Sequence, residues 1–304
     1  MNNCYSFSVH GFDLNGLAEA DPYVAHLNSM VVPEPHLLNF LSANCTQSTT
    51  VRIADVGANI GFTALLMSRA YPDATVHAFE PGPNVFSLMR MNVSGKRIVP
   101  VHAAVSDRNG TACFAENSAF GHLASSGVEV PTISLGDYLD GRGLSHFDFV
   151  KIDVEGFERD VFRGLKGRAS FVFFELNSFA LTCYGNISPV ALLDEIIKDW
   201  DLYEFLTPER LGRVTDLVAT IHRNMVSSGC VTDLIAVPKG TALVTELPNA
   251  APAKAIEAPA PPAVSEADVL RSELNAVYQS MSWRVTAPLR SVNALLKRGT
   301  GARE

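Results

Sequence analysis

The sequence lacks paired cysteines: its five cysteines are scattered over 304 residues and none forms a C-x-x-C pair. This argues against a zinc or dithiol redox site and fits a reducing compartment. A basic balance is also missing, because the formal net charge is −8, and a general nucleic-acid binder is expected to be basic. No apolar run reaches the roughly 18 residues that cross a bilayer, and no basic segment followed by an apolar one marks a secretory signal. We therefore expect a cytoplasmic protein.

The G-x-G-x-x-G fingerprint of dinucleotide-binding folds is absent as well. The chain reads V-R-I-A-D-V-G-A-N-I-G-F from Val51 to Phe62, so Asn59 stands at the second glycine position and Phe62 at the third. An oxidoreductase that uses a nicotinamide cofactor is therefore disfavoured. What the stretch does contain is a strand-like apolar run, a glycine loop and then helix formers up to Ala70, which predict the first half of a βαβ unit.

This glycine loop is the first candidate ligand site. Gly57 and Gly61 allow the backbone to approach a ligand closely, and the helix that follows offers unpaired N–H groups with partial positive charge. Asp55 adds an acceptor at the carboxyl end of the strand, where open α/β sheets bind ligands. The alternative is a tight turn without a ligand.

A second strand is predicted from Ala74 to Glu80, followed by the turn P-G-P. An acid at this strand end, about 20 residues after the glycine loop, is placed to accept hydrogen bonds from ribose hydroxyls. The alternative for Glu80 is an exposed carboxylate with no ligand. A third strand is predicted over 98–105, and Asp107 follows it in the turn S-D-R-N-G, whose sequence also suits an ordinary turn.

The next segments interrupt the regular alternation of strands and helices. T-A-C-F-A at 111–115 predicts a short strand, and 121–127 predicts a loop in which His122 is a weak acid/base candidate. A helix is expected after Ser134, which suits an N-cap position.

The string F-D-F-V-K-I-D-V-E-G at 147–156 is the second strong motif. Its apolar residues predict a buried core strand, and Lys151, Asp153 and Glu155 alternate with them. Buried charges are costly unless they are paired or functional, so we expect a catalytic role, with an ion-pair cluster as the alternative. Glu175 ends a fifth strand at 169–177, close to the same place. Three carboxylates can hold a divalent cation, but the spacing does not demand one, and we expect no metal.

The remaining segments define the domain organisation. Residues 1–45 are expected to form an N-terminal helical or cap segment over the ligand crevice, in which His10, His26 and His36 are weak candidates for substrate contacts. A catalytic domain is expected over 46–240, with a helix at 189–200 and closing strands at 203–206 and 231–237.

A Pro/Ala-rich linker at 241–264 and a helical tail at 265–304 complete the chain. The charges from Ser280 to Arg303 are all basic, and Trp283 and several leucines accompany them. This composition resembles that of a helix that lies at a membrane interface, and a helix that docks on a partner protein is the alternative.

Three strings, D-V-G-A-N-I-G-F, F-E-P and V-K-I-D-V-E-G-F-E, resemble the FkbM-type family of S-adenosylmethionine-dependent methyltransferases. The resemblance covers about 51–238. It implies a class I methyltransferase fold, which is a Rossmann-like α/β fold with seven mostly parallel strands, an antiparallel last strand and helices on both faces. It implies S-adenosylmethionine as cofactor and O-methylation of a sugar or natural-product hydroxyl. The cofactor contacts that we expect are Asp55, Gly57, Ala58, Asn59, Gly61, Glu80, Pro81 and Asp107, the last of them at the adenine.

We therefore expect an O-methyltransferase that acts on a sugar hydroxyl in a cell-surface polysaccharide or related glycoconjugate. Asp153 or Glu155 is the candidate base, and Lys151 the third catalytic candidate. The expected acceptor is a carbohydrate or glycolipid, nucleic acid is not expected, and the tail is expected to contact the inner face of the membrane or a polysaccharide-assembly protein. The alternatives are a natural-product or lipid hydroxyl as acceptor, and a non-catalytic module docked through its tail.

Overall fold

The computed structural model describes residues 4–18, 21–45, 51–117 and 120–249. The predicted tail at 265–304 and most of the predicted linker at 241–264 lie outside the described residues. The description below concerns the unit that ends at Lys254. None of its described helices is both long enough and apolar enough to cross a bilayer.

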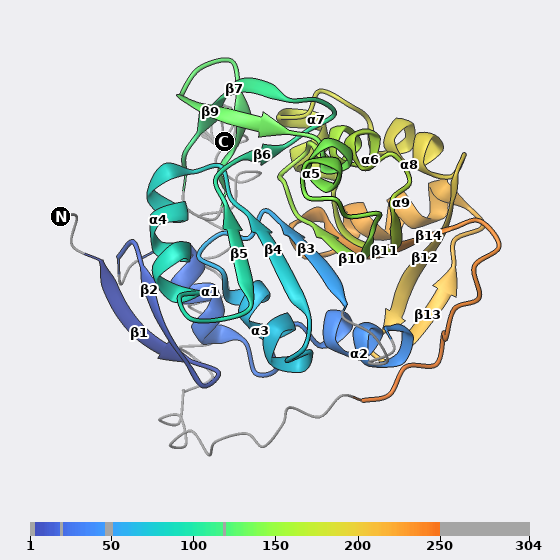
Figure 1. The fold of residues 1–304 in the computed structure, drawn as a ribbon. Helices are drawn as coiled ribbons and strands as arrows, with labels where there is room; N and C mark the ends of the chain where they lie inside the picture. The colour runs from blue at the N-terminus through green and yellow to red at the C-terminus, as the bar shows by residue number, and fades with distance from the viewer. Residues whose placement is uncertain (1–3, 19–20, 46–50, 118–119, 250–304) are drawn as a thin grey trace, which may run out of the picture. The chain divides into compact units, whose positions relative to one another are not determined.

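An eight-stranded mixed sheet forms the centre of this unit (Figure 1). The strands run, from one edge to the other, β13 (Arg210–Arg213), β12 (Trp200–Thr207), β14 (Val231–Pro238), β11 (Ala169–Asn177), β10 (Phe147–Ile152), β3 (Arg52–Val56), β4 (Thr75–Phe79) and β5 (Ile98–Val101). Strands β5, β4, β3, β10 and β11 are parallel, and β14 is antiparallel to both of its neighbours. The predicted class I methyltransferase fold is confirmed, with β13 as one edge strand more than the seven predicted.

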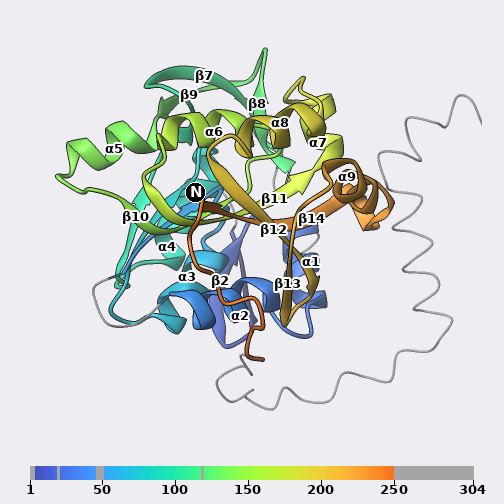
Figure 2. The same ribbon diagram turned by 90° about the vertical axis from the view of Figure 1, so that its right-hand side faces the viewer.

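Helices cover both faces of the sheet (Figure 2). On one face lie α1 (Pro22–Ser29), α2 (Pro35–Asn44), α3 (Phe62–Ala70) and α4 (Pro83–Asn92), which contribute to one buried apolar cluster. On the other face lie α5 (Leu135–Gly141), α6 (Glu158–Leu165), α7 (Ser178–Cys183), α8 (Pro189–Ile196) and α9 (Leu217–Val226), which contribute to a second cluster. The predicted helices on both faces of the sheet are therefore present, as the near-continuous apolar character of the parallel strands requires.

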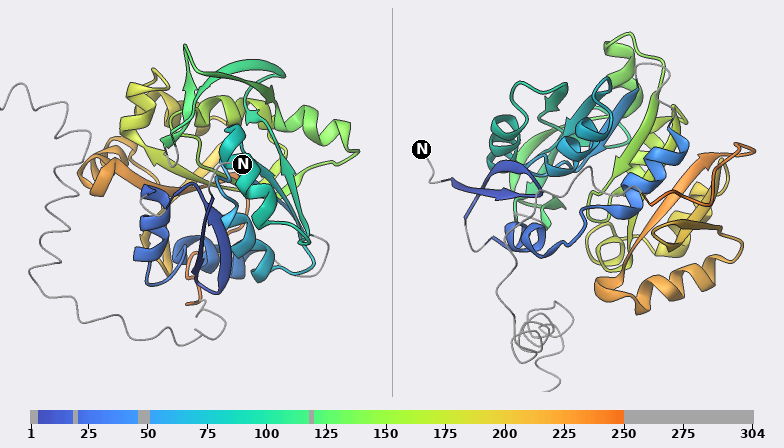
Figure 3. Two further views of the ribbon diagram at one scale, coloured as in Figure 1. Left: turned by 90° about the vertical axis from the view of Figure 1, so that its left-hand side faces the viewer. Right: turned by 90° about the horizontal axis from the view of Figure 1, so that it is seen from below.

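The predicted third strand at 98–105 is wrong in its extent. Strand β5 ends at Val101, where the chain turns, and His102 stacks on Phe86 and contacts the Pro81 carbonyl oxygen through Nε2 at 2.9 Å. The chain then continues as β6 (Ala104–Val105), which belongs to a separate four-stranded sheet (Figure 3). The contacts of His102 lie at the point where the predicted strand is interrupted. The hydrophobic pattern of the sequence gives no sign of these contacts.

The separate sheet also corrects the predicted loop at 121–127. Its order is β6, β9 (Val128–Ile133), β7 (Gly110–Ala115) and β8 (His122–Ala124). Strand β8 pairs with β7 through Phe114 and Leu123, although the sequence there has no regular alternation of apolar and polar residues. The pairing of β8 with β7, and not the local propensity of its residues, therefore accounts for this strand.

The N-terminal segment contains the two helices α1 and α2 but begins with a hairpin that the sequence analysis missed. Its strands are β1 (Tyr5–Val9) and β2 (Phe12–Gly16). The backbone N–H of Asn15 donates to Asn92 Oδ1 at 2.8 Å, which fixes the hairpin on α4 (Figures 1 and 3). The segment thus packs on the face that also carries α3 and α4.

Candidate active site

A cavity of about 180 Å³ lies at the carboxyl ends of β3, β4, β10 and β11, the place where open α/β sheets bind ligands. Of the predicted site residues, those that line it are Gly57, Asn59, Glu80, Pro81, Lys151, Asp153 and Glu155. The structure therefore brings the glycine loop, the F-E-P turn and the K-I-D-V-E motif to one cavity. Asp55, Ala58, Gly61 and Asp107 are not among its lining residues.

Gly57 joins the first motif to the second. Its φ is +82°, and a Cβ at this position would lie 1.8 Å from the carbonyl oxygen of Asp153. The backbone N–H of Asp153 donates to the Val56 carbonyl oxygen at 3.0 Å. The requirement for glycine therefore comes from the close approach of two chain segments as well as from backbone conformation, in addition to any approach of a ligand.

Glu80 holds the glycine loop against the P-G-P turn. Its Oε2 accepts a hydrogen bond from the Asn59 N–H at 3.0 Å and its Oε1 accepts one from the Gly82 N–H at 2.8 Å. Burial raises the pKa of Glu80 to about 7, against the lowering effect of these two amides. A carboxylate oxygen has two lone pairs, so both oxygens keep an acceptor position for the hydroxyls of a cis-diol. This geometry is compatible with the predicted ribose contact. Glu80 also has a structural function, because it joins the glycine loop to the P-G-P turn.

Three of the predicted cofactor contacts, Asp55, Ala58 and Gly61, have contacts within the protein that position the glycine loop. Asp55 is fully buried, and burial raises its pKa to about 6 while the charge of Lys151 counteracts part of the rise. Ala58 is buried and its N–H donates to the Phe79 carbonyl oxygen at 2.9 Å. Gly61, with φ +90°, begins α3 and packs against α4. These residues position the loop, and nothing places them against the cavity.

Asp107 lies apart from the cavity. Its carboxylate contacts the Arg108 guanidinium at 3.4 Å, and a Cβ on Gly164 of α6 would lie 3.3 Å from the Asp107 Cα. The residues that line this end of the cavity are apolar: Ala103, Ala104, Val105 and Phe114. The structure gives the predicted adenine contact of Asp107 no support, because the division of the third strand carries the turn away.

Lys151 and Asp153 form an ion pair beside the cavity. Lys151 Nζ lies 3.0 Å from Asp153 Oδ2, and the lysine side chain is 8% exposed. Burial by itself lowers the pKa of Lys151, but the charges of Asp153, Asp55 and Glu34 outweigh it and hold the pKa above its ordinary value. The lysine is therefore charged. Lys151 and Asp153 form the ion pair that was the alternative to a catalytic role, and such a pair is compatible with a catalytic role as well.

Glu155 follows in a turn with φ +51°, a left-handed conformation that a non-glycine residue adopts at a cost and often at functional sites. The amide of Asn177 donates to its Oε2 at 3.3 Å. Burial, and then the charges of Asp153 and Glu158, raise the pKa of Glu155 to about 8. A carboxylate with such a pKa accepts a proton near neutral pH far more readily than an ordinary glutamate.

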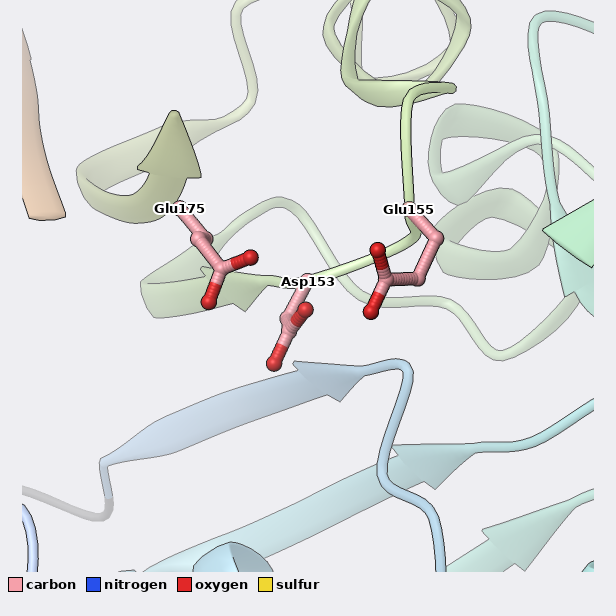
Figure 4. A group of neighbouring side chains, drawn as sticks. All are labelled: Asp153, Glu155 and Glu175. Atoms are coloured by element: carbon pink, nitrogen blue, oxygen red, sulfur yellow. The ribbon is translucent and has the colours of Figure 1, made fainter. Parts of the chain in front are cut away.

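Glu175 of β11 points toward the same place, as expected from the strand order (Figure 4). Asp153, Glu155 and Glu175 each place one carboxylate oxygen within 4.8 Å of the others. Burial, and then repulsion by Asp153 and Glu155, hold the pKa of Glu175 well above its usual range. Oxygens at this separation suit a hard divalent cation; without one, acids that share a site retain protons.

Residues outside the predicted motifs complete the cavity. Tyr23, His26, Met30 and Glu34 of the N-terminal segment line it, as does Asp233 of β14. Glu34 has φ +44°. Only His26 had been singled out in the sequence, because the other residues carry no local motif and come together through tertiary packing.

The other candidate histidines lie at different places. His122 of β8 lines the cavity and stacks on Tyr184 with ring centroids 3.8 Å apart. His36 lies behind the lining, with Nδ1 3.4 Å from Asp233 Oδ2. His10 lies in the β1–β2 turn against Phe62.

These groups fit S-adenosylmethionine in their chemistry. Glu80 keeps acceptor positions for ribose hydroxyls, the apolar residues near Val105 and Phe114 offer a slot for a flat base, and the acids at Asp153 suit a positive sulfonium.

Comparison with known proteins agrees with this geometry. Residues 55–196 match the family profile described as "Methyltransferase FkbM domain". The chain is similar to 31-O-demethyl-FK506 methyltransferase FkbM of Streptomyces tacrolimicus, with 29% identity over 38% of this chain and 59% of that protein. It is also similar to hexuronic acid methyltransferase AglP of Haloferax volcanii, with 28% identity over 41% of this chain and 55% of that protein. The chain thus spans less than two thirds of the length of these two relatives.

A solved structure adds a distant likeness. An O-methyltransferase from Bacillus cereus, in complex with SAH, is 13% identical in sequence to this chain. The match covers 71% of this chain and 86% of the Bacillus chain, with a TM-score of 0.40. On the profile match and the motifs that meet in the cavity, residues 55–196 of this chain resemble the FkbM domain of S-adenosylmethionine-dependent methyltransferases.

Proposed function

We propose that this chain transfers a methyl group from S-adenosylmethionine to a hydroxyl of a sugar in a cell-surface polysaccharide or related glycoconjugate. The observation that supports it most is that one cavity joins the Asn59–Glu80 end to the Lys151–Asp153–Glu155 end. Two relatives are named for sugar-related activity or O-methylation, hexuronic acid methyltransferase AglP and 2-O-methyltransferase NoeI.

The bound cofactor supplies an electrophilic methyl group on its sulfonium. Glu80, Asn59 and the apolar residues near Val105 hold the cofactor at one end of the cavity. The acids at the other end hold the acceptor, and alignment of two reactants in this way contributes roughly 7–11 kcal/mol to a rate enhancement.

Glu155 is the proposed general base, which takes the proton of the reacting hydroxyl at a carboxylate oxygen. Its raised pKa suits this task, whereas the Asp153 carboxylate is engaged in an ion pair with Lys151 at 3.0 Å. Asp153 is proposed to orient the acceptor hydroxyl, and Lys151 to fix Asp153 in place. General base catalysis of this kind contributes about 10²–10⁴-fold.

The test is release of S-adenosylhomocysteine by the full chain with three soluble acceptors: the methyl glycosides of glucose, glucosamine and glucuronic acid. We expect turnover with at least one of them, and a loss of turnover in Glu155→Gln but not in Glu129→Gln, an exposed glutamate on β9. If the chain binds the cofactor but methylates only an apolar natural-product or lipid hydroxyl, the sugar proposal fails. If it methylates nothing and Glu155→Gln changes no property, the non-catalytic alternative is favoured.

A further inference from the structure

The acceptor end of the cavity carries more acidic than basic side chains. Five carboxyl groups line it: Glu34, Asp153, Glu155, Glu175 and Asp233. Among the described lining residues, the only lysine or arginine there is Lys151, and it is paired with Asp153. The two histidines that line the cavity, His26 and His122, carry charge only when protonated.

Sheet register brings three of these acids side by side. Glu175 on β11 lies opposite Asp233 on β14, and Lys151 on β10 lies opposite Phe173, two residues before Glu175. Residues two apart on a strand share a face, so Asp153, Glu175 and Asp233 continue along one face of the sheet. This is the face that α1 and α2 cover, from which Glu34 enters the cavity.

The cofactor does not need all of these acids. Glu80 lies at the end of β4, and β14 is four strands away in the sheet. Neighbouring strands are roughly 4.8 Å apart, so β14 lies on the order of 19 Å across the sheet from β4. The charges that act on Glu34 are those of Lys151, Asp233, Asp153 and Asp55, and those that act on Glu80 are Glu116 and Asp55. Glu34, Glu175 and Asp233 thus form a group separate from the ribose end.

The groups packed around this set compensate it only in part. His36 Nδ1 lies 3.4 Å from Asp233 Oδ2 and balances that acid only when the histidine is protonated. Asn177 donates to Glu155, and Tyr23 is a neutral phenol whose pKa burial raises further above its ordinary value. Burial also raises the pKa of Glu34 to about 7, against the effect of Lys151. A positive group that enters the cavity relieves this repulsion, whereas a negative group adds to it.

We propose that the acceptor end selects sugars by charge: it prefers a sugar that carries a protonated amino group, accepts a neutral sugar less well, and rejects a uronic acid. The inference rests on the proposed function and gives its acceptor class. It separates this chain from its relative that is named a hexuronic acid methyltransferase, because a carboxylate on the sugar would face Glu34, Glu175 and Asp233.

The experiment measures kcat/KM for the methyl glycosides of glucosamine, glucose and glucuronic acid at low salt. It also measures their binding by calorimetry to the full chain saturated with S-adenosylhomocysteine. We expect the glucosaminide to exceed the glucuronide by roughly tenfold or more in both, a ratio that shrinks as salt screens the charges. Glu34→Gln combined with Asp233→Asn should reduce the ratio severalfold, and the matched surface pair Glu129→Gln with Asp73→Asn should leave it unchanged.

Each outcome decides a different point. If the glucuronide binds and reacts as well as the glucosaminide, the charge inference is wrong although sugar methylation stands. If the preference exists but survives the Glu34 and Asp233 changes, these residues do not cause it and the inference is also wrong. If none of the three glycosides binds or reacts while the cofactor product binds, the sugar proposal itself fails, and the charge inference fails with it. Repetition of every arm with EDTA tests whether a divalent cation occupies the acids instead: a preference for the glucosaminide that appears only with EDTA would overturn the proposal for the protein as isolated.

Discussion

The two ends of the cavity are built in different ways. At the cofactor end, Glu80 accepts hydrogen bonds from two backbone amides of the chain itself, Asn59 and Gly82, so its side chain is held in position before a ligand arrives. At the acceptor end, Glu34, Glu175 and Asp233 come from three distant segments and share the single charge of Lys151 with Asp153 and Asp55. The first end is therefore preorganised for one ligand, whereas the second gathers more acids than its single lysine can pair.

The two ends of the cavity also differ in which segments of the chain supply their residues. The cofactor end is made within 57–114, inside the matched family region, whereas the acceptor end draws on Glu34 and Asp233 outside residues 55–196. The matched family region therefore contains all of the residues of the cofactor end but only part of those of the acceptor end. The following predictions test this division, from the largest expected effect to the smallest.

Asp153→Asn should have the largest effect, since Asp153 both pairs with Lys151 and is proposed to orient the acceptor hydroxyl. It removes the partner of a buried lysine and the group that orients the acceptor hydroxyl, so turnover should fall by roughly 10²-fold. Cofactor affinity should change much less. Single-turnover kinetics together with calorimetry measure both quantities, and Asp73→Asn in an exposed turn is the matched control. Parent-rate methylation by Asp153→Asn would show that the acid is structural.

Glu80→Ala should weaken cofactor binding by about 1.5–3 kcal/mol, the cost of lost hydrogen bonds to a charged acceptor. Because Glu80 also holds the Asn59 and Gly82 amides, the melting temperature of the free protein should fall with it. Asp107→Ala is the comparison variant, and we expect its affinity to equal that of the parent, since Asp107 lies outside the cavity lining. The opposite result, in which only Asp107→Ala loses affinity for the cofactor, would favour the adenine contact of Asp107 and contradict the ribose contact of Glu80.

The pH dependence of stability and that of turnover have opposite signs at Glu155. Glu155 has a pKa raised by burial to about 8 in the folded chain, above its unfolded value, so the folded state binds the extra proton. Its contribution to stability is therefore lost as the pH rises from about 5 to 8, while the base form that turnover needs increases over the same range. We expect the melting temperature of the cofactor-free protein to fall and turnover to rise toward pH 8. Glu155→Gln should flatten the first curve, and an unchanged curve would rule out Glu155 as the titrating group.

The parts that could be predicted from sequence are those with local signals. The strand, glycine loop and helix around Gly57, the strand-end acid Glu80 and the core strand before Asp153 each follow from periodicity or composition within a few residues. The hairpin at Tyr5–Gly16, the division of the third strand at His102 and the cavity contacts of Glu34 and Asp233 depend on contacts between distant segments. No window of sequence contains those contacts, and Glu34 gives no local sign that it faces Lys151.

The smallest effect on catalysis is expected from the C-terminal tail. The described residues that line the cavity run from Tyr23 to Asp233, so truncation before Ser265 should leave turnover on a soluble glycoside unchanged. The basic residues from Arg284 to Arg303 and Trp283 are proposed to bind anionic lipid, at about 1 kcal/mol per basic residue near the surface. The full chain should then co-sediment with phosphatidylglycerol-containing vesicles at low salt and the truncated chain should not. If the full chain stays in the supernatant, a protein partner for Trp283 and its neighbours is the better account, and if truncation lowers turnover on the soluble glycoside, the acceptor end is not complete within the described residues.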